Sequence, residues 1–535
     1  MKVITSEEMQ KIDHAAINNY GVPGIHLMER AGEACADAIR SRFSTATRKS
    51  VLIFAGKGNN GGDGYVIASK LHAFGWDVSL VILAHRSDIS GDAEISLSRL
   101  PNSVMLKCCC DNESLAAFSD LGQYALVVDA IFGTGLKSEI SGVYRQAIKL
   151  INSSGLPVIA VDIPSGVDGN TGAILGVAIR ADLTITFAAA KLGHVLYPGA
   201  VCTGELMIAD IGIPSEVVQR AHGYEFVDAG SATALLMPRL PVSHKGSFGH
   251  VLIVAGSTGH TGAAVLAGAS AVRSGAGLVT LAVPSSLNQI FEIKTTEAMT
   301  LPIEDAGRGY LRRESLAHIL AGLAGKNVVA LGPGLSRQPE TALLVQALLT
   351  AVSLPLVVDA DGLNAISENV SVLGKRAASV VVLTPHPGEM ARLTGLSIAE
   401  IEADRIGVST KFAQLHKVYL ILKGARTIIA SPDGEVAING SGNPGMASGG
   451  MGDVLTGIVA SLIGQGYPPF NACRLAVFIH GYAADLVAQE KGEVGLIASD
   501  VVAKLPVALQ RLLRDCKSRA GLDLQNYGKQ SPRLS

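Results

Sequence analysis

Short uninterrupted runs of apolar residues recur along the chain, separated by alanine-rich segments whose apolar residues return at helical spacing. Such runs predict strands that are buried on both faces, which is typical of parallel sheets covered by helices. The predicted strands span residues 51–55, 78–83, 125–128, 157–161 and 183–187, and then 251–255, 278–283, 328–331, 356–358, 380–383 and 419–422. The pattern therefore predicts an α/β protein.

The same pattern predicts two domains in tandem, because the runs at 51–56 and 251–256 each look like the first central strand of a doubly wound sheet. A chain of 535 residues is also too long to fold around a single hydrophobic core of ordinary size. We expect one domain over residues 1–220, a linker over 221–240 and a second domain over 241–510. Residues 511–535 are polar and basic with weak periodicity, which predicts a partly disordered tail.

The composition indicates a globular enzyme of the cytoplasm. The chain is 48% hydrophobic and 17% charged with a formal net charge of −2, so it lacks the basic excess of a nucleic-acid binder. No apolar stretch is long enough to span a bilayer and the N-terminus is too polar for an export signal, so we expect no membrane partner. Seven cysteines without a CxxC pair indicate neither a disulfide framework nor a zinc site.

Glycine is densest between residues 442 and 453, just before apolar residues at helical spacing. Backbone N–H groups in such a loop can approach an anion closely, and the helix N-terminus that follows favours negative charge. Asp453 lies at the junction, where it suits a base or a partner for a hydroxyl that meets a phosphoryl group. The alternative is a flexible turn with a glycine C-cap and Asp453 as N-cap.

In the first half, polar residues follow the predicted strands, where ligands of parallel sheets bind. The loop 56–64 combines five glycines with two asparagines and an aspartate, which suits a phosphate, a ribose or a small cation; a tight turn is the alternative. Asp129 and Asp162 each end a strand and, with Asn60 and Ser165, suit a hard cation, although each aspartate alone is also a common N-cap. Lys191 is either a proton carrier beside Asp162 or an exposed lysine.

This half resembles the YjeF N-terminal family, the NAD(P)H-hydrate epimerases, through the sequences at 59–64, 129–136 and 161–166. The resemblance implies a Rossmann-like doubly wound domain that interconverts the R and S forms of NADHX and NADPHX. It implies a potassium site and a substrate contact at Asp162. Inversion needs proton transfer and reversible bond breaking at the hydrated carbon, so Asp162 and Lys191 are the catalytic candidates. The implied potassium ligands are Asn60, Asp129 and Ser165. The implied substrate-binding residues are Asn59, Asn60, Gly61, Gly62, Asp63, Gly133, Thr134, Gly135, Leu136, Lys137, Ser138 and Glu139.

In the second half, Lys423 and Arg426 follow a predicted strand, where they suit nucleotide phosphates or form a basic hairpin turn. His386 lies between two prolines that fix its backbone, so it is either a ligand-binding or a structural histidine. Residues 332–335 and 359–364 also end strands.

These features resemble the YjeF C-terminal family, the ADP- or ATP-dependent NAD(P)H-hydrate dehydratases of ribokinase-like fold, through residues 384–389, 423–424 and 442–453. The resemblance implies that Asp453 activates the ring hydroxyl for phosphorylation and that elimination then restores NAD(P)H, with magnesium on the nucleotide. The implied nucleotide-binding residues are Lys423, Gly424, Ala425, Arg426, Thr427, Asn443, Gly449, Gly450 and Gly452. The implied hydrate-binding residues are Ala263, Gly334, His386 and Asp453.

An epimerase that supplies one isomer to a selective dehydratase explains why both halves share one chain. The two resemblances together therefore predict a bifunctional repair enzyme for hydrated nicotinamide cofactors, which we expect to be a homo-oligomer. Two alternatives remain. The second half could be a small-molecule kinase, and the first half could be a module that only binds a nucleotide-like ligand.

Overall fold

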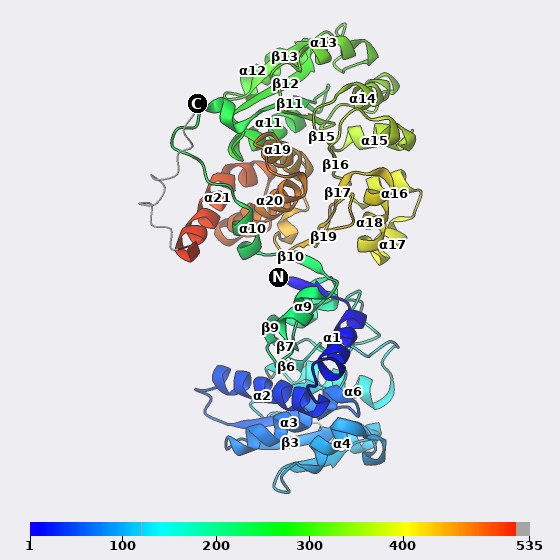
Figure 1. Ribbon diagram of the computed structural model, residues 1–535, viewed down its shortest axis with the longest axis vertical. Coiled ribbons are helices and arrows are strands. Elements are labelled where there is room, and N and C mark those ends of the chain that lie inside the picture. Colours follow the sequence, from blue (N-terminus) through cyan, green and yellow to red (C-terminus); the bar gives the residue numbers. More distant parts are fainter. Residues whose placement is uncertain (119, 521–535) are drawn as a thin grey trace. The chain divides into compact units, whose positions relative to one another are not determined.

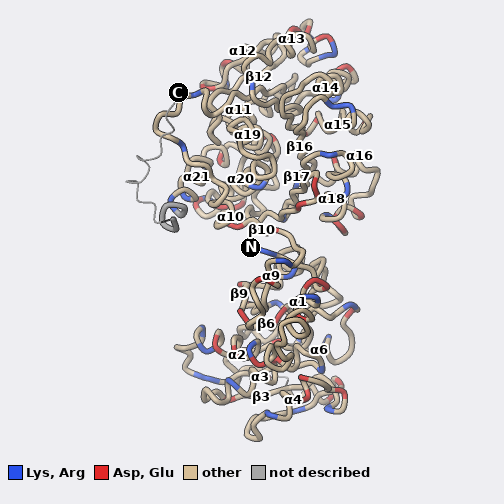
Figure 2. The backbone as a smooth tube through the Cα atoms, viewed as in Figure 1, with Lys and Arg blue, Asp and Glu red and all other residues tan. Residues whose placement is uncertain are grey.

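The computed structural model describes residues 1–118 and 120–520, and these form two compact units (Figure 1). The N-terminal unit is Lys2–Tyr224, and the C-terminal unit begins at Glu225 and includes Met1. Each unit buries its own apolar core. Basic and acidic residues are interspersed along both units (Figure 2). Among the described residues, no helix is long and apolar enough to cross a membrane.

A parallel seven-stranded sheet forms the centre of the N-terminal unit, in the order β4-β3-β2-β5-β6-β7-β9. The strand order reverses direction between β2 and β5, which is where doubly wound sheets bind ligands. The strands are β2 (Ser50–Ala55), β3 (Asp77–Ile82), β4 (Met105–Cys108), β5 (Leu126–Ala130), β6 (Val158–Val161), β7 (Leu183–Phe187) and β9 (Glu205–Ala209), and β1 (Lys2–Ile4) pairs with β8 (Ala190–Lys191). The five strands predicted in this half are confirmed.

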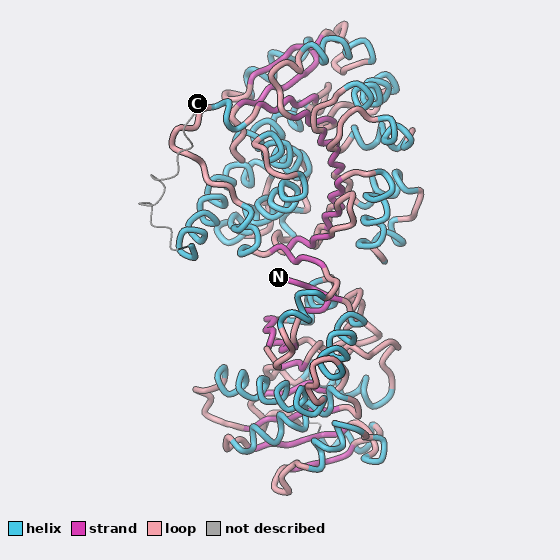
Figure 3. Tube along the Cα trace, viewed as in Figure 1, coloured by secondary structure: helices cyan, strands magenta, loops and turns pink. Residues whose placement is uncertain are grey.

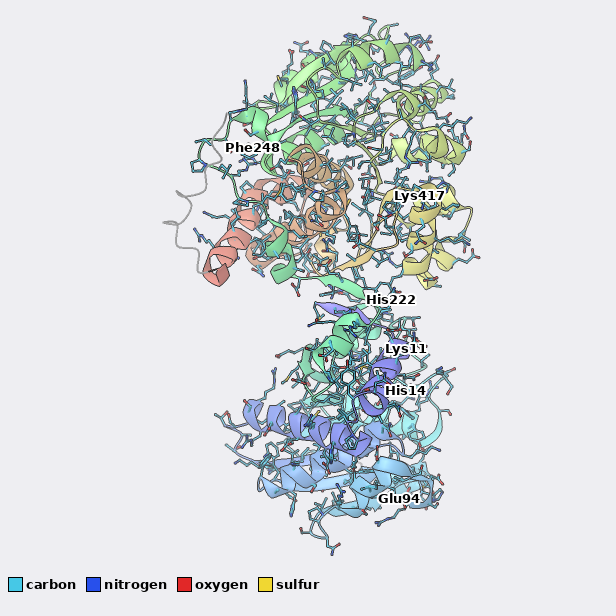
Figure 4. The ribbon with its side chains drawn as sticks, viewed as in Figure 1. Lys11, His14, Glu94, His222, Phe248 and Lys417 are labelled. Carbon is cyan, nitrogen blue, oxygen red and sulfur yellow. The ribbon has the colours of Figure 1, made fainter. Side chains whose placement is uncertain are left out.

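Helices cover both faces of this sheet, as the two separate apolar clusters on its sides show. They are α1 (Ser6–Asn18), α2 (Gly24–Arg42), α3 (Asn59–Ala73), α4 (Gly91–Ser98), α5 (Asn112–Leu115), α6 (Gly142–Ser153), α7 (Leu192–Val195), α8 (Gly199–Thr203) and α9 (Ser215–Arg220). Helix α1 begins where the Thr5 side chain accepts a hydrogen bond from the Glu8 N–H. It buries Met9 and Ile12 and exposes Lys11 and His14 (Figure 4).

The C-terminal sheet has the order β13-β12-β11-β14-β15-β16-β17-β18-β19-β10. It is parallel from β13 to β17, and β18 is antiparallel to both of its neighbours. The strands are β10 (Tyr224–Val227), β11 (His250–Val254), β12 (Leu278–Pro284), β13 (Met299–Ile303), β14 (Val328–Leu331), β15 (Leu356–Val358), β16 (Val381–Leu383), β17 (Tyr419–Leu422), β18 (Ile428–Ala430) and β19 (Val436–Asn439). All six strands predicted in this half are confirmed, and the unit has the α/β architecture expected of a ribokinase-like domain.

Helices also lie on both faces of the C-terminal sheet, with the strands between them (Figure 3). One layer contains α10 (Ala229–Leu235), α11 (Thr261–Arg273), α19 (Met451–Gly464), α20 (Pro469–Lys491) and α21 (Ala498–Ala520). The opposite layer contains α14 (Pro339–Ala351), α15 (Asp361–Ser367), α16 (Pro387–Thr394), α17 (Ile398–Ala403) and α18 (Arg405–His416) (Figure 1). Two further helices, α12 (Asn288–Lys294) and α13 (Leu316–Ala321), flank β13. Helix α19 is apolar nearly all round because other helices and the sheet enclose it.

Two segments differ from what the sequence suggested. Residues 221–240, expected to be a linker, contain β10 and α10, because Val227 and Ala232 are buried in the core of the C-terminal unit. The expected tail starts at 511, but α21 continues through Ala520 with Leu512 fully buried. Residues 521–535, the rest of that tail, lie outside the described residues.

Candidate active sites

The N-terminal unit has a cavity of about 760 Å³ at the carboxyl ends of its central strands. The sequence-predicted residues in its wall are Asn59, Asn60, Asp63, Gly133, Thr134, Gly135, Leu136, Lys137, Ser138, Asp162 and Lys191. Gly61 and Gly62 are buried in the first turn of α3 instead, where a Cβ would meet the Gly56 carbonyl or the Met28 side chain. Glu139 is exposed beside Arg145 and outside the cavity wall.

Asp162 and Lys191 form a buried ion pair in the cavity wall. The Lys191 side chain is 1% exposed, and its Nζ donates to Asp162 Oδ1 at 2.7 Å, to Thr186 Oγ1 at 2.7 Å and to the Phe187 carbonyl at 3.2 Å. The alternative of an exposed Lys191 is therefore wrong. Burial alone would raise the pKa of Asp162, but the Lys191 ammonium outweighs burial, and this pKa lies below its ordinary value.

The second oxygen of Asp162 faces open space. Asp162 has a φ of 65°, in the left-handed region that residues other than glycine rarely adopt. Its Oδ2 makes no hydrogen bond to another described residue, and a Cβ added to Gly133 would lie 3.2 Å from it. Glycine at 133 thus leaves room for a ligand directly above this oxygen.

His194 and Asp13 also lie at this site, although no motif in the sequence indicates either residue. Nδ1 of His194 accepts from the Lys191 N–H at 3.0 Å, and its Nε2 donates to the Asp162 carbonyl at 2.8 Å. Burial and Lys191 lower the pKa of His194 to about 4, so the ring is neutral. Burial raises the pKa of Asp13 to about 6 and also raises the pKa of Asp63 well above its ordinary value, with the Asp162 charge adding to both. The cavity therefore combines Asp162, whose pKa is lowered, with Asp13 and Asp63, whose pKa values are raised.

Two of the three expected potassium ligands, Asp129 and Ser165, bind each other, and the third, Asn60, lies in the cavity wall. Asp129 is fully buried; its Oδ1 accepts from Ser165 Oγ at 2.6 Å and its Oδ2 from the Ser165 N–H at 2.8 Å. Both amide atoms of Asn60 are buried and have no hydrogen-bond partner among the described residues. Burial raises the pKa of Asp129 to about 6, which a nearby cation would reverse.

The chemistry of these three side chains fits a hard cation. They offer one carboxylate with hydroxyl and amide oxygens, the hard ligands that such ions prefer. Within residues 1–118 and 120–520, no group of three or more His, Cys, Asp and Glu side chains is placed to hold a metal. The orphaned amide of Asn60 is the observation that favours a bound ion.

In the C-terminal unit, Lys423 is the centre of a buried polar cluster. Its Nζ lies 2.7 Å from Asp359 Oδ1 and 3.7 Å from Glu389 Oε2, and Thr456 of α19 donates to Asp359 Oδ2 at 2.7 Å. Burial lowers the pKa of Lys423, but Asp359 and Glu389 outweigh burial and raise it. Lys423 is thus a fixed positive charge at the end of β17.

The glycine loop ends beside this lysine. Asp485 of α20 anchors the loop by accepting from the Gly442 N–H and from Asn443 Nδ2, both at 2.9 Å. Helix α19 follows Gly450, whose φ is 88°, and a Cβ added to Gly452 would lie 3.2 Å from Lys423 Nζ. Free N–H groups at a helix N-terminus next to a fixed ammonium make an anion site.

Asp453 is the third residue of α19, so Gly450 and not Asp453 is the N-cap. Burial, together with the charge of Asp359, raises the pKa of Asp453 to about 7 despite the attraction of Lys423. A carboxyl with this pKa is matched to removing a proton near neutral pH.

Three further predicted residues of this unit, His386, Ala263 and Gly334, lie at the starts of two helices and in a loop. His386 caps α16, because its Nδ1 accepts from the Gly388 N–H at 3.0 Å while Glu389 accepts from the His386 N–H at 2.8 Å. Its ring is half exposed, so it both holds the helix and faces the site. Gly334 has a φ of 60°, and a Cβ there would lie 3.1 Å from that of Ala263, so these two residues are neighbours.

The turn that follows β17 is held by arginines. Arg426 donates to the Gly440 carbonyl at 2.9 Å, which joins the turn to the start of the glycine loop. Arg405 of α18, which the sequence did not single out, donates to the carbonyls of Leu422 and Lys423. Thr427 Oγ1 donates to the Gly424 carbonyl, Ala425 is exposed, and Gly449 has open space around it. The guanidinium of Arg426 thus supports the turn in this structure.

Two family models match the chain, one for each unit. The model described as YjeF-related protein N-terminus matches residues 24–193. The model described as NAD(P)H-hydrate dehydratase matches residues 251–507. Both cavity-lining loops of the N-terminal unit and the whole Lys423 cluster fall inside these ranges.

Similar proteins extend over nearly the whole chain. The bifunctional NAD(P)H-hydrate repair enzyme Nnr of Moorella thermoacetica is 44% identical over 519 residues, which cover 96% of this chain and 97% of that protein. The enzyme of the same name from Escherichia coli is 36% identical over 502 residues, covering 94% and 92%. A crystal structure of ADP/ATP-dependent NAD(P)H-hydrate dehydratase from Bacillus subtilis matches 54% of this chain and 99% of its own at 30% identity, with a TM-score of 0.47.

Proposed function

We propose, for a chain that belongs to the family of bifunctional NAD(P)H-hydrate repair enzymes, that each unit holds a complete active site and that the two sites act in series. The N-terminal unit is the epimerase domain and the C-terminal unit is the dehydratase domain. A match over nearly the full length sets aside the alternatives of a small-molecule kinase and of an N-terminal module that only binds.

In the epimerase domain, Asp162 is the proposed proton acceptor. The hydrated carbon carries a hydroxyl and the ring nitrogen, so loss of the hydroxyl proton and cleavage of the carbon–nitrogen bond give an open-chain aldehyde. Rotation and re-addition of the nitrogen then form the other isomer. Oδ2 of Asp162 faces the space left by Gly133, while Lys191 holds Oδ1. Asp13 and Asp63, with their raised pKa values, are placed to return the proton.

Asn60, Asp129 and Ser165 are the proposed ligands of a potassium ion in this domain. When bound, the ion supplies positive charge that offsets buried Asp129 and fixes the Asn60 side chain. Because Asn60 belongs to the first turn of α3, this fixes the cavity wall that α3 and the loop around Gly133 share.

In the dehydratase domain, Asp453 is the proposed base. It removes the proton of the ring hydroxyl as that oxygen attacks the terminal phosphoryl group of ADP or ATP. The N–H groups at the start of α19 and the ammonium of Lys423 stabilise the charge that develops on this group. The ring nitrogen lone pair then expels phosphate and forms an iminium, and loss of a proton from the adjacent ring carbon restores the ring double bond of NADH or NADPH. We expect magnesium to accompany the nucleotide phosphates.

One observation carries this assignment: a carboxyl with a pKa of about 7 lies in the first turn of a helix whose N-terminus and neighbouring lysine form an anion site. The test is to incubate the protein with hydrated NADH and ATP and to follow the absorbance of the reduced nicotinamide. We expect the absorbance to return, with one nucleotide phosphate bond consumed per hydrate. Nucleotide consumption without restored absorbance would contradict the assignment.

A further inference from the structure

A second cavity, of about 480 Å³, opens at the carboxyl ends of β11, β13, β14 and β15 in the dehydratase domain. The loops after these strands supply His260, Arg308, Tyr310, Arg337 and Asp361 to its wall. We propose that this cavity binds the phosphate groups of the hydrated dinucleotide through Arg308 and Arg337. The proposal rests on the function assigned above and adds the residues that hold the far end of the substrate.

The loop that carries Arg308 is held in place by a buried carboxylate. Asp305 is fully buried, and its Oδ2 accepts from Ser286 Oγ and from the Gly309 N–H, both at 2.6 Å. Hydrogen bonds to a buried carboxylate are stronger than neutral ones and limit the movement of the backbone that donates them. Arg308 therefore projects from a fixed turn.

The loop that carries Arg337 is fixed as well. Ser336, the residue before it, has a φ of 86°, which is unfavourable for any residue other than glycine. Its N–H donates to Asp361 Oδ2 at 3.0 Å, and Thr341 lies 3.2 Å from its hydroxyl. Strain of this kind persists only where surrounding contacts enforce it, and it is concentrated at binding sites.

The two guanidinium groups are available to an anion. Arg337 is exposed and makes no hydrogen bond or ion pair with another described residue. Arg308 is half exposed, 3.3 Å from the Tyr310 hydroxyl and 3.6 Å from Glu340 Oε2, and Tyr310 also donates to that carboxylate. The Glu340 carboxylate thus contacts both Arg308 and Tyr310. The Asp361 carboxylate accepts hydrogen bonds from the Ser336 N–H and from the Asn364 side chain. Among the charged residues of the cavity wall, the two arginines lie with one aspartate, and Arg337 has no ion-pair partner among the described residues.

The position of the cavity separates it from the nucleotide site. Along the carboxyl edge of the sheet, Lys423 follows β17 and His386 follows β16, whereas most of the cavity wall follows β13, β11 and β14. The two regions adjoin at the loop after β15, where Asp359 contacts Lys423 and Asp361 lines the cavity. Gly334 links the two regions, because it precedes Arg337 in one loop and a Cβ there would lie 2.7 Å from the His260 carbonyl. With the hydrated ring between Gly334 and Asp453, the rest of the dinucleotide extends away from the nucleotide phosphates and into the cavity.

The test compares Arg337→Gln and Arg308→Gln with a matched control, Arg273→Gln, in the full-length protein. Arg273 is an exposed arginine at the far end of α11, whose first turn is next to the cavity. The measured quantities are kcat, KM for the S isomers of NADHX and NADPHX, and KM for ATP.

Loss of one charge-assisted contact to phosphate should raise the KM for hydrate about tenfold in each cavity variant, with kcat and the KM for ATP unchanged. An increase for both hydrates assigns the contact to the diphosphate, and an increase for NADPHX alone assigns it to the 2′-phosphate. An unchanged KM for both hydrates, or an increase in the KM for ATP instead, would overturn the proposal. Absence of turnover in the wild type and in the Arg273→Gln variant would instead refute the assigned function.

Discussion

Replacing Asp453 with asparagine should strongly slow dehydration and, at the same time, stabilise the C-terminal unit. The side chain is buried beside Asp359, and the two charges repel each other, which together with burial raises the pKa of Asp453 from 3.8 to about 7. Asparagine has nearly the same shape but cannot ionise and cannot accept the hydroxyl proton. Loss of a general base lowers turnover by about 10²- to 10⁴-fold.

The stabilisation should depend on pH in a defined direction. Below about pH 4 the carboxyl is protonated in both the folded and the unfolded chain, so its ionisation does not lower the free energy of unfolding. Between about pH 4 and pH 7 the folded state holds the proton more tightly, so stability falls as pH rises, and above pH 7 the cost is complete. One pKa unit corresponds to about 1.4 kcal/mol, so a rise from 3.8 to about 7 means that ionised Asp453 lowers the free energy of unfolding by about 4 kcal/mol at most.

The assay is hydrogen exchange of the α19 amides, with the variant and the wild type compared at the same pH. We expect slower exchange in Asp453→Asn, with a larger gain at about pH 8 than at about pH 5. Asp433→Asn, which removes an exposed carboxylate of the same unit, is the control and should change neither exchange nor turnover. A gain that is equal at both pH values, or a variant less stable than the wild type at pH 8, would refute the electrostatic account of Asp453.

Three further outcomes follow from the site geometry. Asp162→Asn should lower turnover of the R isomer by about 10²- to 10⁴-fold and leave use of the S isomer intact in isomer-resolved chromatography; wild-type use of the R isomer would remove Asp162 from the mechanism. Asn60→Ala should abolish potassium stimulation of epimerisation without affecting dehydration, and equal stimulation in the variant would exclude Asn60 as a ligand. Lys423→Met should leave Asp359 unpaired, destabilising the C-terminal unit by about 3–5 kcal/mol in urea unfolding, and an unchanged unfolding free energy would contradict this.

Strands that are buried on both faces were predictable from the sequence, because uninterrupted apolar runs leave little ambiguity. The strands that the pattern missed are β1, β4, β8, β9, β10, β13, β18 and β19. Several are short or partly exposed, and β9 has three exposed residues, so they carry no continuous apolar signal. For this reason the pattern predicts a linker where β10 lies, although pairing with β19 places β10 inside the second unit.

Residues with a dense local motif were also predictable, as Asp162, Lys191, Lys423 and the glycine loop illustrate. Asp359 was visible at a strand end, but its contact with Lys423 spans 64 positions in the sequence. Asp13 and His194 sit in elements without any motif, and only the fold brings them to the Asp162 cavity. Contacts of this kind depend on tertiary packing, and no spacing along one chain encodes them.

The most direct test of two sites acting in series uses the Asp453→Asn variant, pure R-isomer hydrate and ATP in one reaction, with both isomers and the reduced nicotinamide followed over time. Because the epimerase site is intact in this variant, we predict that the R isomer converts to a mixture of R and S while reduced nicotinamide forms about 10²- to 10⁴-fold more slowly than in the wild type. Persistence of pure R isomer, or formation of reduced nicotinamide at the wild-type rate, would contradict the assignment of the two activities to two separate sites.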